Sequence, residues 1–424
     1  MTLATLAIST HDRTILREIG ARIAEVGSSA VMDERRRLSI KLNRLEAERP
    51  MVLLWPGGHL IDAEFAPEKL ACEGAWAKGI ERQLREKLWN HEVIGDDIVI
   101  NPRFEHRGFT IASDYGVQST KSWGNDGQGH GSMIWDPPLK DLPADLEKLH
   151  FRRHTYDRAF FQAERALLED VFAGVLPVVH RGIWYQWTMG LTIDAVDLIG
   201  LERFLIGMYD EPEHLHALMA FLRDDHQAML DWYEQEGLLQ PNNGDGMMGA
   251  GGNFYTDLLP QPDFVPGQPA RLKDCWALSE SQETVGVSPE LFEEFVFQYQ
   301  LPIISRFGLA CYGCCEPLDT RWHIIKQIPN LRRVSVSPWS NIHVMAENLG
   351  KGYIYSRKPN PTLISTEQWD EDAIRTDLRD TLLASKGLNV EFIMKDIMTD
   401  CGQPWRYARW IEIAREEIDK VYGG

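Results

Sequence analysis

Short apolar segments alternate with longer amphipathic segments along most of this chain, and this alternation limits the folds that it can adopt. Apolar runs of this length are typical of strands that are buried on both faces. Strands that are joined by helices pair in parallel, so the pattern predicts an α/β protein. Eight such segments predict a closed (β/α)8 TIM-like barrel, and an open doubly wound sheet is the alternative. The expected strands span residues 51–55, 176–180, 238–240, 275–278, 309–312, 333–336, 352–355 and 390–395.

Two of the helical segments have clear start signals. The segment 289–307 has Pro289 in its first turn, and its apolar residues recur on one face. A long helix is expected after Asp210, which stands three residues before Glu213 in the spacing of a capping box. Other helices are expected at residues 157–173, 319–327, 342–349, 366–386 and 404–421.

The rest of the chain is expected to add to the barrel. Residues 1–50 are predicted to form an N-terminal helical extension, because residues 11–48 are charged, amphipathic and free of proline. The barrel is then expected over residues 51–424, with an irregular inserted lid region at residues 96–140. Within this region, residues 124–131 are predicted to form a loop, because they lack the strand-to-helix context of a dinucleotide-binding motif.

Charge and composition exclude several classes of protein. The formal net charge is −19, which opposes binding to nucleic acid or to anionic lipid. No apolar run approaches the roughly 20 residues that span a membrane, and the first 13 residues lack the basic region of a signal peptide. Six clustered cysteines do not form a disulfide framework. A cytoplasmic protein is expected, with no nucleic acid or membrane as partner.

Sulfur ligands follow the expected strand 309–312. The sequence Cys-Tyr-Gly-Cys-Cys-Glu-Pro gathers three of the six cysteines at its end. Barrel active sites are built at these strand ends, and zinc binds sulfur well. Cys401 follows the last expected strand, so Cys314 and Cys401 are the best pair of zinc ligands. The alternative is that these thiols are buried packing residues. Candidates for the third ligand are Cys315, Glu316, Glu283, His343 and His180.

Acidic and aromatic residues are expected at the same end of the barrel. Glu283 and Asp245 follow two expected strands and are predicted to be catalytic acids, or else to stabilise a helix start or a loop. Several of the fourteen tryptophans fall in expected loops, where they would line a pocket for a flat molecule; packing in the core is the alternative. The aromatic residues predicted to bind the cofactor are Trp184, Trp187, Tyr255 and Trp339.

Two segments of the chain resemble motifs of the uroporphyrinogen decarboxylase superfamily. They are Leu201–Glu213 and the run from Val287 through Phe295 to Pro302, and the likeness covers roughly residues 140–420 in pattern. True uroporphyrinogen decarboxylases carry an Arg-Gln-Ala-Gly-Arg element after the first strand, where arginines bind the acidic substrate. Here that place reads Trp-Pro-Gly-Gly-His over residues 55–59, without an arginine.

The chain is more similar to the zinc- and corrinoid-dependent methyltransferases of this superfamily. They bind zinc through a His-x-Cys-Gly element and a later cysteine. Cys314 matches the first cysteine and Cys401 the later one, while Tyr312 replaces the histidine and is a further candidate catalytic residue. The resemblance implies one zinc and a possible homodimer. The chain has no Asp-x-His-x-x-Gly element, so a corrinoid (methylcobalamin) is expected on a partner protein.

The resulting expectation is an enzyme that moves a methyl group between a corrinoid protein and a small molecule. The small molecule is a methylated or methoxylated donor, as in O-demethylation, or a methyl acceptor. One alternative is a metal-free decarboxylase of a small carboxylic acid on the same fold. The other is a non-catalytic protein that binds a corrinoid or a tetrapyrrole.

Overall fold

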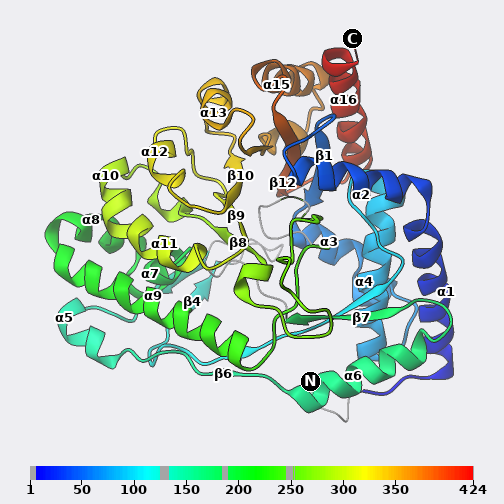
Figure 1. The fold of residues 1–424 in the computed structure, drawn as a ribbon, viewed down its shortest axis with the longest axis horizontal. Coiled ribbons are helices and arrows are strands. Elements are labelled where there is room, and N and C mark those ends of the chain that lie inside the picture. Colours follow the sequence, from blue (N-terminus) through cyan, green and yellow to red (C-terminus); the bar gives the residue numbers. More distant parts are fainter. Residues whose placement is uncertain (1–5, 125–132, 184–189, 245–251, 253, 424) are drawn as a thin grey trace.

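A six-stranded parallel sheet forms the larger part of a curled α/β barrel of the TIM type (Figure 1). The computed structural model describes residues 6–124, 133–183, 190–244, 252 and 254–423. Along the sheet, β1 pairs with β12, followed by β11, β10, β9 and β8, and every pair is parallel. These strands are β1 (Met51–Pro56), β8 (Trp276–Ser279), β9 (Leu309–Tyr312), β10 (Leu331–Val336), β11 (Ile354–Arg357) and β12 (Asn389–Ile397).

A second parallel pair, β2 (Phe104–Gly108) with β7 (Val178–Ile183), extends the ring. Residues 238–240 follow β7 without being a regular strand. The amide of Ile183 nevertheless donates to the carbonyl of Leu238 at 3.1 Å.

The edge of β1 that faces β2 carries no strand ladder in the described residues. Instead, the amide of Val52 donates to Asp97 at 2.9 Å, and the amide of Leu54 donates to Asp96 at 3.0 Å. Burial raises the pKa of Asp96 to about 6. Carboxylates therefore satisfy the backbone groups that a neighbouring strand would otherwise bind.

Helices cover the outside of the ring (Figure 1), because the strands are buried on both faces and need apolar cover. Four short antiparallel strands lie outside the ring, paired as β3 (Ile111–Ala112) with β6 (His154–Thr155) and as β4 (Thr120–Trp123) with β5 (Met133–Asp136). The α-helices are α1 (Thr10–Gly27), α2 (Ala30–Asn43), α3 (Gly58–Glu64), α4 (Ala75–Trp89), α5 (Leu142–Asp145), α6 (Arg158–Val171), α7 (Thr192–Ile199), α8 (Leu201–Asp210), α9 (Pro212–Gln235), α10 (Pro289–Phe292), α11 (Gln298–Ile304), α12 (Trp322–Ile325), α13 (Ile342–Leu349), α14 (Thr362–Ser365), α15 (Glu371–Ala384) and α16 (Trp405–Tyr422).

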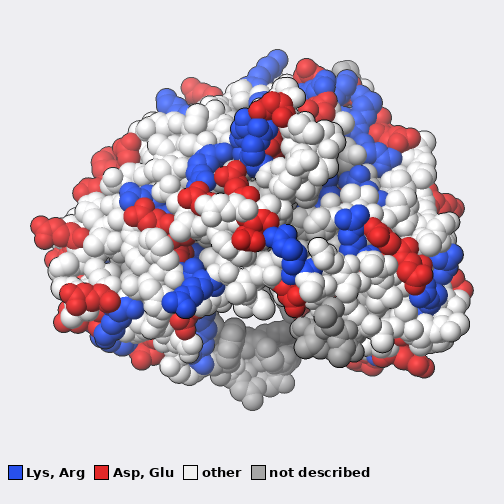
Figure 2. Space-filling view, turned by 60° about the horizontal axis from the view of Figure 1, so that its bottom comes forward, with Lys and Arg blue, Asp and Glu red and all other residues white. Residues whose placement is uncertain are grey.

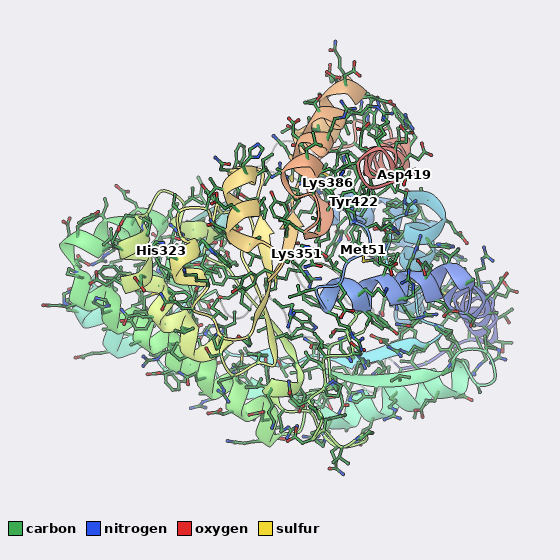
Figure 3. All side chains as sticks on the ribbon, turned by 45° about the horizontal axis from the view of Figure 1, so that its top comes forward. Met51, His323, Lys351, Lys386, Asp419 and Tyr422 are labelled. Atoms are coloured by element: carbon green, nitrogen blue, oxygen red, sulfur yellow. The ribbon has the colours of Figure 1, made fainter. Side chains whose placement is uncertain are left out.

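The helix α2 packs at the amino-terminal end of the ring. Its buried Leu38 and Leu42 contact Met51 and Ile354, the first residues of β1 and β11. Figure 3 shows this end, with Met51 and Lys351 labelled. The opposite, carboxyl end of the strands is therefore the open end at which a site can form.

An ion pair lies in the interior of the ring. Arg333 on β10 donates to Glu391 on β12 at 2.7 Å, and both side chains are fully buried. Asn43 at the end of α2 accepts a further hydrogen bond from Arg333 at 3.2 Å. Such a pair is tolerated inside a protein only because its partners replace the lost water.

Seven of the eight expected strands form, and the TIM-like barrel is confirmed. The segment 238–240 is the exception, and the strand β2 was missing from the expected set. The capping box expected at Asp210 is wrong. Asp210 is the last residue of α8, and α9 begins at Pro212 without a side-chain cap from Glu211. In contrast, Ser288 caps α10 by accepting from the amide of Leu291.

The surface charge and the character of the helices bear on whether the protein binds nucleic acid or a membrane. On the face shown in Figure 2, lysine and arginine are interspersed with aspartate and glutamate. Among the described residues, no helix combines the length and the apolar character needed to cross a membrane.

Candidate active site

Two cysteine sulfurs lie side by side just after β9. Gly313 turns the chain there with a φ of +95°, and a Cβ at this position would stand 2.6 Å from the side chain of Leu318. Only glycine fits such a turn without strain. The turn brings the Sγ atoms of Cys314 and Cys315 to 3.4 Å from each other. Cys314 is buried, and Cys315 is half-buried.

Lys395 brings a positive charge to the two sulfurs from β12. Its Nζ atom lies 3.6 Å from the Sγ of Cys314 and 3.5 Å from the Sγ of Cys315. The same ammonium donates to Asp396 at 2.6 Å. Burial opposes the charge on Lys395, but the sulfurs and Asp396 outweigh it and raise the pKa of Lys395.

The two thiols have different acidities because one donates to the other. The hydrogen bond from Cys314, together with the charge of Lys395, lowers the pKa of Cys315 to about 7. Donating that bond and being buried raise the pKa of Cys314. Cys315 is therefore the more acidic thiol of the pair and has the larger share of thiolate, the reactive form of cysteine.

Buried carboxyl groups surround the sulfurs. Glu316 accepts from the amides of Ser281 and Cys314 at 2.8 and 2.9 Å, and so ties the end of β8 to the end of β9. Burial raises the pKa of Glu316. Glu280 is 4% exposed, and burial with the charges of Glu316 and Glu283 raises its pKa to about 9. Glu280 is therefore a protonated acid at neutral pH, available as a proton donor.

The predicted catalytic residues occupy different places. Glu283 accepts from the hydroxyl of Thr192 at 2.7 Å and adds its charge to the surroundings of Glu280. Tyr312 is fully buried against α11, where its hydroxyl donates to Gln300 at 2.7 Å, and burial raises its pKa. Asp245 lies outside the described residues.

The predicted aromatic pocket is only partly described. Tyr255 lies near the amino-terminal end of the ring, since its carbonyl accepts from Asn43 at the end of α2. Trp339 follows β10 and is 70% exposed. Trp184 and Trp187 lie outside the described residues. Tyr255 and Trp339 are thus not brought together at the sulfur pair.

The residues near the sulfurs do not fit a resident zinc ion as arranged. Two sulfurs 3.4 Å apart suit neighbouring ligands of one metal, but a catalytic zinc needs a third protein ligand. Cys401 lies beside α14, with its Sγ atom 3.8 Å from the carbonyl of Ser365. In the part of the chain that the structure describes, no group of three His, Cys, Asp or Glu residues is placed to hold a metal. The cation next to the sulfurs is instead the ammonium group of Lys395.

Sequence reasoning missed the pairing of Lys395 with the cysteines and preferred Glu283 to Glu280. The motif itself located the sulfurs, because the two cysteines are adjacent. Lys395 stands at the end of the last expected strand, and this position was the available sign of its role.

Comparisons with known proteins give a weak structural similarity and no match in sequence. No family model and no curated protein sequence matches this chain. Among solved structures, a methyltransferase from Methanosarcina mazei is similar with a TM-score of 0.46 and 14% sequence identity. The match covers 90% of this chain and 97% of the methyltransferase. A similarity of this extent carries no argument about the reaction.

Proposed function

We propose that this chain is an enzyme that removes a methyl group from a small methoxylated or methylated molecule, with Cys315 as the first methyl acceptor. The observation that carries the proposal is the Cys315 sulfur, 3.5 Å from the ammonium of Lys395, with the buried carboxyl group of Glu280 at the end of the neighbouring strand β8. A thiolate to accept carbon and an acid to protonate oxygen are what cleavage of a methyl ether requires.

Cys315 and Glu280 are sufficient for the first step, the cleavage of the carbon–oxygen bond. The sulfur of Cys315 attacks the methyl carbon, the sulfur–carbon bond forms, and the carbon–oxygen bond breaks with its electron pair on oxygen. Glu280 gives its proton to that oxygen. Glu280 is then a carboxylate, and it regains a proton from solvent.

Transfer of the methyl group onward returns Cys315 to the thiolate form. The ammonium of Lys395, 3.5 Å from the Sγ of Cys315, stabilises this thiolate as a leaving group. In this proposal, a corrinoid on a partner protein supplies the final acceptor, as the resemblance to corrinoid-linked methyltransferases implies. Cys314 holds the sulfur of Cys315 in place by its hydrogen bond.

A decarboxylase is the second candidate, and one observation favours it. An enzyme that removes CO2 needs an acid to protonate the carbanion that is left, and Glu280 is such an acid. Lys395 would then bind the substrate carboxylate. In this reaction Cys315 carries no methyl group at any stage.

The test is to look for the methyl group on sulfur. The protein is incubated without corrinoid with a panel of aromatic and aliphatic methyl ethers that carry a ¹³C-methyl group, and its peptides are analysed by mass spectrometry. We expect the label on Cys315, no label in Cys315→Ser, and slow labelling in Glu280→Gln. Release of the demethylated product by Cys315→Ser at the wild-type rate would overturn the proposal. Release of CO2 from a panel of ¹³C-carboxylic acids, with unlabelled Cys315, would establish the second candidate instead.

A further inference from the structure

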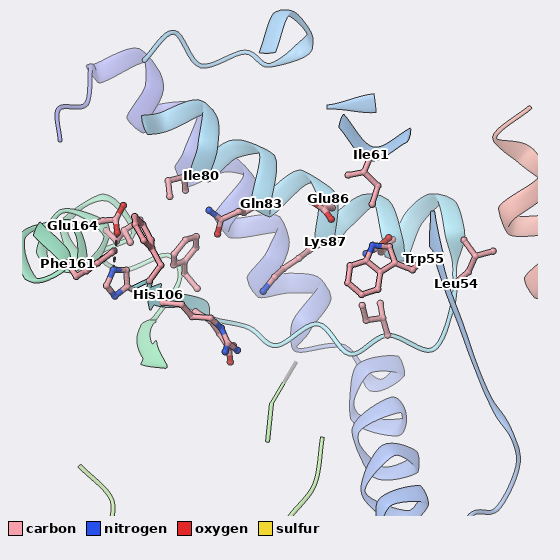
Figure 4. Close-up of a pocket in the computed structure, with 17 residues that line it drawn as sticks. Leu54, Trp55, Ile61, Ile80, Gln83, Glu86, Lys87, His106, Phe161 and Glu164 are labelled. Atoms are coloured by element: carbon pink, nitrogen blue, oxygen red, sulfur yellow. Dashed lines mark hydrogen bonds and ion pairs between the residues drawn. The ribbon is translucent and has the colours of Figure 1, made fainter. Parts of the chain in front are cut away.

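A cavity lies where β1 and β2 part from each other. Its volume is about 500 Å³, within the range of roughly 300–1,000 Å³ that is typical of small-molecule sites. One wall is the face of α4 that carries Ile80, Gln83 and Lys87. The opposite wall comes from the ends of β1 and β2, and α6 closes one side (Figure 4).

Most of the wall is apolar, and much of it is aromatic. The aromatic side chains belong to Trp55, Phe104, Phe109 and Phe161. The rings of Phe109 and Phe161 meet edge to face, with centroids 5.0 Å apart. Aromatic rings of this kind bind flat apolar groups, and their faces also attract organic cations.

Most charged groups of the cavity are already neutralised by the protein. Glu105 accepts from Arg107 at 2.7 Å. At the end of the cavity where His106 lies, Glu164 accepts from the indole of Trp76 at 2.9 Å and contacts His106 at 3.2 Å. Lys87 has a partner of its own within the protein.

Glu86 differs from these groups. No hydrogen bond or ion pair reaches its carboxylate from any residue that the structure describes, and burial raises its pKa. Figure 4 shows Glu86 at the same end of the cavity as Trp55 and Ile61. Glu86 is half-buried, and only the longer-range attraction of Arg82 and Lys87 offsets its charge. A cationic ligand in direct contact with this carboxylate would therefore gain free energy.

We propose that this cavity binds a small organic ammonium ion with an apolar or aromatic body. Glu86 pairs with the ammonium group, Trp55 contacts the cation, and the remaining aromatic walls bury the apolar body. The inference is independent of the chemistry at Cys315, because none of the residues around the sulfurs lines the cavity.

The experiment compares two probes of similar shape and different charge. Binding of benzylammonium and of benzyl alcohol to the full chain is measured by isothermal titration calorimetry at pH 7. We expect benzylammonium to bind more tightly than benzyl alcohol, roughly tenfold or more, since a hydrogen bond between two charged groups is stronger than one between neutral groups. Equal affinities for the two probes, or no binding of benzylammonium, would overturn the proposal.

Three variants locate the site. Glu86→Gln keeps the shape of the side chain and is expected to weaken benzylammonium roughly tenfold or more while leaving benzyl alcohol unchanged. Gln83→Trp, which places a large ring in the cavity from an exposed position on α4, is expected to abolish binding of both. Glu18→Gln, an exposed change on α1, is the matched control. Wild-type affinity in both Glu86→Gln and Gln83→Trp would show that the ammonium binds elsewhere.

Discussion

The Nζ atom of Lys395 lies 3.5 Å from the Sγ atom of Cys315, although 80 residues separate them in the sequence. The parallel sheet brings them together, because β9 and β12 end at the same edge of the ring. A thiol next to a fixed ammonium is a stronger acid than a free thiol.

Cys315 is expected to be the most reactive of the six cysteines. With its pKa near 7, about half of it is thiolate at pH 7, and its alkylation by iodoacetamide rises with pH up to about pH 8. Lys395→Met raises the Cys315 pKa and slows alkylation at pH 7 about three- to tenfold, with little change at pH 10. Lys386→Met, an exposed lysine labelled in Figure 3, is the control. Equal rates in Lys395→Met and wild type at pH 7 would contradict this assignment.

The free energy of unfolding is expected to fall as pH rises through the range in which Glu280 is protonated in the folded state and ionised in the unfolded state. The unfolded carboxyl loses its proton near pH 4.5, whereas the folded one keeps it up to about pH 9. Folding therefore takes up a proton between these values, so this contribution is complete below pH 4.5 and is lost by about pH 9. Glu280→Gln is expected to flatten this part of the curve of unfolding midpoint against pH. Glu347→Gln, a change at an exposed position, is the reference variant. If the unfolding midpoint of Glu280→Gln falls with pH as steeply as that of wild type, Glu280 is not the group responsible.

Zinc content separates the motif-based prediction from the observed geometry. If Cys314, Cys315 and Cys401 bind zinc, elemental analysis gives about one zinc per chain, which is lost in Cys314→Ser and in Cys401→Ser. Because Lys395 stands at the sulfurs, we expect far less than one zinc per chain and no change in Cys401→Ser. One zinc per chain that disappears in both variants would restore the three-cysteine site.

The buried pair in the ring interior is expected to be sensitive to loss of one partner. Arg333→Met leaves the Glu391 charge alone and should lower the free energy of unfolding in urea by about 3–5 kcal/mol. The double variant Arg333→Met with Glu391→Met should lose less, because no unpaired charge is left. Arg165→Met, which breaks an exposed ion pair with Glu169, is the reference and should cost about 0.5 kcal/mol or less. A double variant as unstable as Arg333→Met would argue against this account.

The alternation of apolar and amphipathic segments was sufficient to predict the barrel. Most strands that pack under the outer helices have an apolar run, even though β10 and β12 also carry the buried pair Arg333 and Glu391. The strand β2 did not follow this rule. Its Glu105 is paired with arginines and its His106 with Glu164, so its sequence is polar although it pairs with β7. Arg103 and Arg107 are neighbours of Glu105 in the sequence, but Glu164 and Arg181 are remote, so the sequence alone does not show the full set of partners.

The residues of the candidate site could likewise be predicted only in part. Adjacent cysteines after a strand could be recognised, but the pairing of Cys315 with Lys395 depends on the curvature of the sheet, which brings the ends of β9 and β12 together although β10 and β11 lie between them. Glu283 and Glu280 are indistinguishable by residue type, and only burial separates the protonated acid, Glu280, from the half-buried Glu283. Both distinctions arise from tertiary structure.

The carboxylates of Asp96 and Asp97 on the free edge of β1 have a consequence for association between molecules. A bare strand edge is a template on which another chain can add a strand. Here the amides of Val52 and Leu54 are already occupied by the buried carboxylates of Asp97 and Asp96, and Asp97 is itself paired with Arg49 and Arg415, so these two donors are not available to an incoming strand. The edge of β1 at which the ring is interrupted is therefore a poor template for aggregation, although no strand pairs with it in the described residues.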